Sequence, residues 1–155
     1  MCLTARALGA SEIIFTSSKK EKLVRYAGRL ERDWGGVFGV TFNHDYRKVL
    51  ADANKYKKVY LTRYGVPLPK LIYSLKTYKN IMLIVSSVQA SSKPLHEIAD
   101  FNISVTDQPH CGAAAIAIFL HEFYEGRELA VHFKNSKYKV IPAEHGINVE
   151  TIERE

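Results

Sequence analysis

Hydrophobic residues recur along the chain in two alternating ways. In some segments they stand three or four positions apart, the spacing of a helix with one buried face, and in others they form short continuous or alternating runs, as buried strands do. Polar or glycine-containing stretches separate the two kinds of segment. This alternation predicts an α/β fold in which helices flank a mostly parallel sheet.

The same spacing gives the bounds of each expected element. Helices are predicted over residues 3–8, 20–34, 45–53, 69–76, 94–99, 112–124 and 128–133. Strands are predicted over residues 12–16, 37–42, 58–62, 81–85, 101–105 and 138–141. Gly9 and Gly35 would end the first two helices, Asp45 would cap the third, and Pro69 would begin the fourth. No repeat or linker divides these elements, so a single domain over 1–155 is expected.

Loops of unusual composition follow the strands that end at Thr62, Val85 and Val105. Because parallel sheets bind ligands at the carboxyl ends of their strands, these loops are the candidate binding segments. The first, LTRYGVP over 61–67, has a glycine that lets backbone approach a ligand, and a plain strand-to-helix turn is its more ordinary interpretation. The second, over 86–92, is small and polar.

The third loop, over 104–112, crowds polar side chains between a buried strand and the most apolar helix of the chain. Backbone N–H groups at the start of that helix favour a carboxylate or another anion. A second interpretation stays open, in which Thr106 or Asp107 only organises the turn and His110 is a solvated surface histidine.

The charge balance bears on the partner. Among 155 residues, 22 are lysine or arginine and 16 are aspartate or glutamate, which gives a formal net charge of +6 and an isoelectric point near 9.3. Such a balance favours polyanions, nucleic acid among them. Basic and aromatic residues interleave at 55–58, 63–64 and 76–79, which suits phosphates and unstacked bases, although a solvated helix face explains each stretch as well.

Several chemistries have no support in the sequence. No GxGxxG motif follows a strand and no GxxxxGK[ST] motif exists, so neither a dinucleotide nor ATP is indicated. The histidines form no HExxH motif and the cysteines no CxxC motif, so no metal site is expected. No apolar run has the length of a membrane helix and no secretory signal opens the chain, so a cytoplasmic protein with reduced thiols is expected.

Stretches spread in order over nearly the whole chain resemble one known family. They are LTARALGA over 3–10, WGG over 34–36, LTRYG over 61–65, DFNISVTDQPHCGAAAIAIFL over 100–120 and EGREL over 125–129. The family is that of the archaeal SPOUT-class enzymes that methylate the ribose 2′-hydroxyl of cytidine 56 in the T-loop of tRNA.

The resemblance implies a SPOUT-type α/β fold whose C-terminal part is threaded through itself as a trefoil knot, and a homodimer. The apolar helix over 112–123 also favours a homodimer, although a buried core helix explains its composition nearly as well. The resemblance further implies that tRNA is the substrate and that S-adenosylmethionine binds in the knot, largely through backbone groups. Carried over, the cofactor-binding residues are Leu61, Ser86, Ser87, Val88, Gln89, Ala90, Ile103, Ser104, Val105, Thr106, Asp107, Gln108, Pro109 and His110.

The chain departs from the family pattern at three places. Residues 86–89 read SSVQ where the family more usually has glycine followed by alanine and charged residues, and Asp107 stands where asparagine is usual. Family members also carry a strand and an arginine- and histidine-containing stretch before the segment that matches 3–10. Either the start of the chain is misassigned or truncated, or the chain is a degenerate member of the family, and it is expected to bind tRNA while transferring methyl groups poorly or not at all.

No catalytic residue is assigned from the sequence. Attack by a ribose hydroxyl calls for a cation that stabilises developing negative charge on the oxygen. Arg6 and Arg63 are the nearest candidates in matching segments, and a helix-surface or phosphate contact is the favoured interpretation of both. The alternatives to the enzyme are an RNA-binding domain of the same fold without catalysis and a small-nucleotide binder with no RNA partner.

Overall fold

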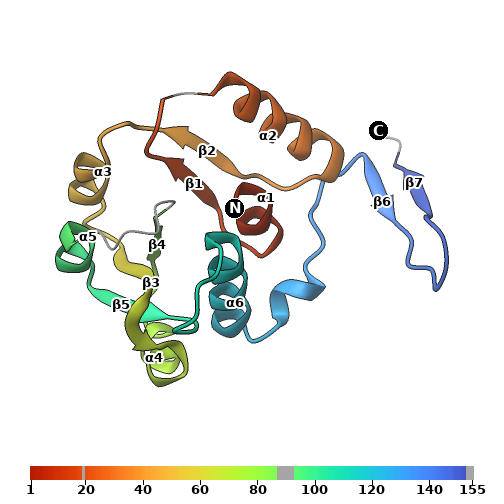
Figure 1. Cartoon of the computed structure of the whole chain (residues 1–155). Helices are drawn as coiled ribbons and strands as arrows, with labels where there is room; N and C mark the ends of the chain where they lie inside the picture. The colour runs from red at the N-terminus through yellow and green to blue at the C-terminus, as the bar shows by residue number, and fades with distance from the viewer. Residues whose placement is uncertain (19, 87–92, 153–155) are drawn as a thin grey trace. The chain divides into compact units, whose positions relative to one another are not determined.

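The computed structural model describes residues 1–18, 20–86 and 93–152, and in it the chain forms two compact units. The first unit comprises Met1–Ala10 and Asp45–Ala130, and the second comprises Ser11–His44 and Val131–Glu155. Each unit is therefore built from two separate stretches of sequence. Both contain parallel strands and helices, which confirms the α/β class (Figure 1).

The first unit is built on a three-stranded parallel sheet with the order β4-β3-β5. Its strands are β3 (Lys57–Pro67), β4 (Ile81–Val85) and β5 (Phe101–Ser104). Its helices are α1 (Cys2–Ala7), α3 (Tyr46–Asp52), α4 (Leu68–Leu75), α5 (Lys93–Ile98), α6 (Gly112–Tyr124) and the short 3₁₀ helix η1 (Arg127–Ala130).

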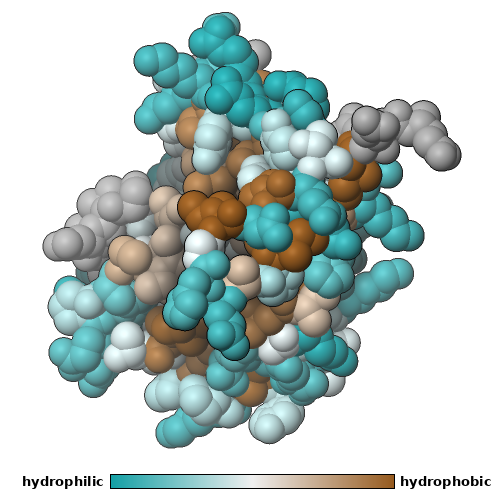
Figure 2. Space-filling view, turned by 90° about the vertical axis from the view of Figure 1, so that its right-hand side faces the viewer, coloured by the Kyte–Doolittle hydropathy of each residue, from teal (hydrophilic) through white to brown (hydrophobic). Residues whose placement is uncertain are grey.

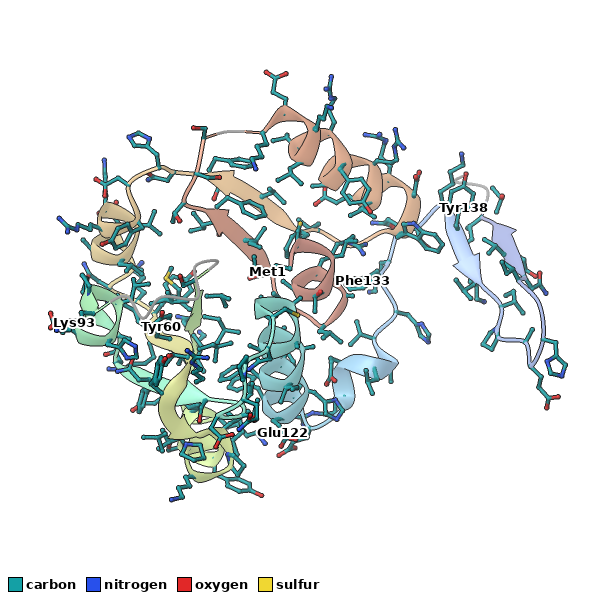
Figure 3. The ribbon with its side chains drawn as sticks, viewed as in Figure 1. Met1, Tyr60, Lys93, Glu122, Phe133 and Tyr138 are labelled. Carbon is teal, nitrogen blue, oxygen red and sulfur yellow. The ribbon has the colours of Figure 1, made fainter. Side chains whose placement is uncertain are left out.

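Apolar side chains from β3, β5, α4 and α6 form the core of the first unit. Val59, Leu68, Leu75, Ile103 and Phe119 are fully buried there. Helix α5, which begins at Lys93, lies beside the part of β3 that carries Tyr60 (Figure 3). The Tyr60 ring is 5.0 Å from that of His96 in an edge-on contact. Because β3 is covered in this way, its middle reads as a continuous apolar run, as expected for a buried parallel strand.

Strand β3 pairs with β5 twice. Leu61 is opposite Ile103, and Val66 is opposite the same residue after a shift in register. The residues between them bulge out of the ladder, after which the strand continues to Pro67. The sequence predicted a strand that stops at 62, because the hydrophobic run ends there and the second pairing carries no apolar pattern of its own.

The second unit contains β1 (Glu12–Phe15) paired in parallel with β2 (Gly39–Phe42), and α2 (Glu21–Trp34) between them in sequence. It also contains the antiparallel pair β6 (Tyr138–Val140) and β7 (Val149–Thr151). The ring of Trp34 lies 5.9 Å from that of Tyr138, and the backbone N–H of Lys137 donates to the carbonyl of Asp33. The end of α2 therefore anchors the start of this hairpin.

Most of the predicted helices and strands are present, with small shifts at their ends. Asp45 caps α3 as expected, since its carboxylate accepts from the backbone N–H groups of Arg47 and Lys48. The helix predicted over 128–133 is wrong beyond Ala130, because the chain leaves the helix there and Phe133 and the carbonyl of Lys134 contact Gly36 instead. Strand β7 was not predicted.

No helix in the described ranges is long and apolar enough to cross a membrane. The same part of the chain holds no group of three or more histidine, cysteine, aspartate or glutamate side chains placed to bind a metal ion.

Candidate functional site

The carboxyl ends of three parallel strands lie side by side in the first unit. Leu61 in β3 is paired with Val85 at the end of β4 on one side and with Ile103 in β5 on the other. Ser86 directly follows β4, and Ser104 ends β5. The structure thus brings together the three segments that the sequence singled out. Ser87, Val88, Gln89 and Ala90, which continue the middle segment, lie outside the described residues.

Gly65 in the first loop packs against the backbone of β5. A Cβ atom at this position would overlap the backbone of Asn102 and Ile103. The hydroxyl of Ser104, which is 6% exposed, donates to the carbonyl of Gly65 over 3.2 Å and ties the loop to the end of β5. The sequence suggested that this glycine lets the backbone come close to a ligand. In the structure, the space that a side chain would take at Gly65 is filled by the backbone of β5.

The third loop is held in shape by its own polar groups. The hydroxyl oxygen of Thr106 accepts from the backbone N–H of Gln108 at 3.2 Å, and the side-chain amide of Gln108 donates to the carboxylate of Asp107 at 2.8 Å. Nδ1 of His110 lies 2.7 Å from the carbonyl oxygen of Gln108. Thr106 therefore organises the turn, as one of the two interpretations held, and residues 107–110 remain exposed.

Helix α6 begins beside the end of β4. A Cβ atom on Gly112 would lie 2.6 Å from Cγ1 of Val85 and 3.0 Å from the sulfur of Met1, so only glycine fits this close approach. The N-cap residue, Cys111, makes no side-chain hydrogen bond to the first turn. The N–H groups of that turn are thus placed at the same sheet edge and keep the affinity of a helix start for anions.

The two candidate cations have different surroundings. Arg6 lies in α1 and is 8% exposed. Arg63 lies in the bulged part of β3, exposed, with its guanidinium 4.9 Å from the centre of the Tyr64 ring and a hydrogen bond of 2.7 Å to the Tyr64 hydroxyl. Only Arg63 is accessible to a large partner.

A groove of about 400 Å³ runs along α6, away from the strand ends. Leu8, Ala117, Ile118, His121, Glu122, Glu128 and Leu129 line it. Ile118 is 44% exposed and Leu129 is 69% exposed, while the carboxylate of Glu128 is buried and holds Nδ1 of His121 at 2.7 Å. Burial raises the pKa of Glu128, but its hydrogen bonds to His121 and to its own backbone N–H, with the charge of His121, outweigh burial and leave the pKa below its ordinary value.

Sequence reasoning did not single out this groove. Its apolar residues stand on a helix that is hydrophobic on most sides, so their spacing does not separate an exposed stripe from the core. The EGREL stretch was the available signal, since it contains both Glu128 and Leu129.

Comparison with known proteins shows which family has this arrangement of strands and helices. Residues 34–150 match the model of a family described as tRNA ribose 2′-O-methyltransferase, aTrm56. The chain belongs to this family. The match contains all three strand-end segments and α6.

Similar members of the aTrm56 family share about a third of their residues with this chain. A tRNA (cytidine(56)-2′-O)-methyltransferase of Methanopyrus kandleri is 32% identical over 98% of this chain and 86% of that protein. An enzyme of the same name from Pyrococcus horikoshii is 35% identical over 96% of this chain and 74% of that protein. The one from Thermococcus kodakarensis is 33% identical over 99% of this chain and 87% of that protein.

Among solved structures, the SpoU methyltransferase AviRb of Streptomyces viridochromogenes, determined in complex with the cofactor AdoMet, superposes with a TM-score of 0.51. The two sequences are 18% identical, and the match covers 80% of this chain and 53% of AviRb. The chain thus spans about half the length of AviRb, and the likeness establishes a SpoU-type methyltransferase fold.

Proposed function

We propose that this protein transfers a methyl group from S-adenosylmethionine to the ribose 2′-hydroxyl of cytidine 56 in the T-loop of tRNA. The observation that carries the proposal is family membership over residues 34–150, with relatives of that activity that match nearly the whole chain. The meeting of Leu61, Ser86 and Ile103 at one edge of a parallel sheet supports it, because such edges bind ligands.

The residues at this edge fit S-adenosylmethionine. Val85, which is partly exposed at the end of β4, offers an apolar contact for an adenine ring, and the first turn of α6 offers N–H groups for a carboxylate. The cofactor would be held by Leu61, Ser86–Ala90 and Ile103–His110, within a C-terminal trefoil knot. When bound, it supplies an electrophilic methyl group.

The contribution of the chain to the reaction is mainly positional. The three strand ends would hold the cofactor, and the exposed residues 107–110 would contact both the cofactor and the tRNA, so that the two reactants are held together. The attacking ribose oxygen gains negative charge as its proton leaves, and a nearby cation lowers the barrier. Arg63, which is exposed at the same end of β3, is a candidate for this contact.

The experiment measures methyl incorporation from labelled S-adenosylmethionine into an unmodified tRNA transcript. Incorporation should be slow, as the departures of residues 86–89 and Asp107 from the family pattern predict, should depend on cytidine 56, and should disappear when this nucleotide carries a 2′-deoxyribose. The matched control is a 2′-deoxyribose at a neighbouring T-loop position, which should leave incorporation intact. A chain that binds the transcript but incorporates no methyl group would instead support the RNA-binding domain without catalysis.

We also propose that the protein works as a homodimer in the cytoplasm, with a second copy seated on the groove along α6. The exposed Ile118 and Leu129 support this, since side chains of this size gain most when a partner covers them. In the space-filling view, hydrophobic residues (brown) reach the surface among hydrophilic ones (teal) (Figure 2).

Replacing Ile118 by glutamate should convert the dimer to a monomer. An unpaired carboxylate in an apolar interface costs several kcal/mol, so the dissociation constant should rise by about a hundredfold or more. Light scattering at micromolar concentration measures the change. Val37→Glu, which alters a side chain that is 93% exposed in the second unit, is the control and should leave the mass unchanged. A wild-type protein with the mass of one chain would refute the dimer.

A further inference from the structure

A second surface of the first unit lies at the opposite edge of its sheet. Residues 54–58, which include the first two residues of β3, and residues 78–80, which lead into β4, line a cleft of about 250 Å³ together with Asp100. The strands are parallel, so this cleft lies at their amino ends, while the candidate cofactor site lies at their carboxyl ends. Along β3, Lys57 and Leu61 are separated by roughly 13 Å at about 3.3 Å per residue.

The cleft unites two of the basic and aromatic stretches that the sequence singled out separately. The backbone N–H of Lys57 donates to the carbonyl of Asn80 over 2.9 Å, and the ammonium of Lys57 lies 5.5 Å from the centre of the Tyr78 ring. Residues from 55–58 and from 78–80 are therefore held side by side by the fold. If each stretch were only a solvated face of its own element, the two stretches would have no reason to lie together, so that interpretation does not explain their contact.

Asp100 fixes one lysine and leaves the others for a partner. Its carboxylate accepts from the ammonium of Lys57 at 3.2 Å and from the backbone N–H of Lys58 at 2.8 Å. Burial raises the pKa of Asp100, but these hydrogen bonds and the two lysine charges outweigh burial and hold the pKa below its usual value. Within the part of the chain that the structure describes, the ammonium groups of Lys55, Lys58 and Lys79 make no ion pair.

The composition of the cleft fits a polymer better than a small anion. Lys55 and Lys79 are exposed, so each is suited to one phosphate of an extended backbone and neither encloses a ligand. Tyr56, which is 44% exposed, stands beside them and offers a ring to an unstacked base. Positive charges spread over two loops with an accessible aromatic ring are the features with which proteins hold RNA.

We propose that this cleft, lined by Lys55, Tyr56, Lys58 and Lys79, is an anchoring surface for the phosphate backbone of the tRNA substrate, separate from the site of methyl transfer. The proposal rests on the proposed function for the identity of the RNA. The two edges are roughly 13 Å apart along β3, a span that one tRNA molecule would bridge. The cleft then supplies affinity, and the strand ends supply the chemistry.

The test compares two triple variants of the full chain with equal loss of charge. Lys55→Gln, Lys58→Gln and Lys79→Gln together alter the cleft; Lys22→Gln, Lys134→Gln and Lys139→Gln alter exposed lysines of the second unit. Filter binding with unmodified tRNA over a range of KCl concentrations measures affinity and its salt dependence. Calorimetry with S-adenosylmethionine measures the strand-end site independently.

The cleft variant should bind tRNA about tenfold or more weakly at low salt, and the slope of log affinity against log salt should fall by roughly 2. Its affinity for S-adenosylmethionine should be unchanged, and the KM for tRNA should rise with little change in kcat. Substituting arginine for the same three lysines keeps the charge and should restore tRNA affinity. Equal losses in the cleft and control variants would overturn the proposal, as would a cleft variant that binds like the wild type.

The outcome is separable from that of the proposed function. A wild-type chain that methylates cytidine 56, with a cleft variant that binds tRNA normally, refutes the anchoring surface alone. A chain that never transfers a methyl group, with a cleft variant that loses RNA binding relative to the control, refutes the enzyme and supports the surface.

Discussion

Replacing Gly65 by alanine is expected to lower the free energy of unfolding of the first unit by about 3 kcal/mol or more. The added Cβ would overlap the backbone of Asn102 and Ile103, and backbone atoms cannot rotate away as a side chain does. The loop must then lift from β5, which also breaks the bond from Ser104 to the Gly65 carbonyl. Because that loop borders the candidate cofactor site, binding of S-adenosylmethionine should be lost with it.

Urea unfolding followed by circular dichroism measures the stability change, and calorimetry measures cofactor binding. Gly28→Ala is the matched control, because a Cβ there meets only Nη1 of Arg32 at 3.7 Å. Alanine within a helix should stabilise the second unit by about 0.5–1 kcal/mol. If Gly65→Ala were as stable as the wild type, the close packing of this loop on β5 would be wrong.

Gly35→Ala should have a comparable effect on the second unit, again about 3 kcal/mol. Gly35 has a φ of 72°, which alanine adopts only with strain, and its Cβ would overlap the carbonyl oxygen of Lys134 and lie 2.8 Å from the backbone nitrogen of Ser136. The backbone strain and the overlap act together, so the segment that contains Lys134 and Ser136 should detach from the end of α2. The fluorescence of Trp34, the one tryptophan of the sequence, reports this detachment.

Gly146→Ala separates the contribution of backbone strain from that of the steric overlap. Gly146 has a φ of 85° and nothing within 4 Å of the added Cβ, so its substitution carries backbone strain alone, about 1 kcal/mol. A loss at Gly35 no greater than the loss at Gly146 would show that the contact with Lys134 does not hold the segment.

The parts of the fold that the sequence predicted are those whose structure is determined by residues within or next to the element itself. Helix α3 follows from the Asp45 cap and one apolar stripe, and α6 follows from a long apolar run that begins after a polar loop. The continuation of β3 to Pro67 has no such cause, because it depends on Ile103, a residue far along the chain. The brief β7 pairs with β6 through backbone groups and has exposed side chains, so no buried pattern marks it.

The site divides in the same way. The order of parallel strands places their carboxyl ends at one edge, so the bulged end of β3 and the segments after β4 and β5 could be named without coordinates. The sequence could not show that β5, and not a ligand, packs against Gly65. Both kinds of close approach require a glycine, so the residue type does not distinguish them. The cleft around Asp100 was also missed, because its lysines belong to stretches more than twenty residues apart in sequence.

The pairing of α1 with α6 sets the order in which the first unit can be completed. The Tyr124 hydroxyl donates to the Gly9 carbonyl over 3.3 Å, across 115 positions of sequence. At roughly 5–20 residues per second, synthesis of that stretch takes on the order of 6–23 s. Helix α1 is therefore made long before its partner, and during that interval its buried residues, Ala5 and Arg6, lack the cover of the complete unit, so this helix is among the last parts of the unit to reach its native place.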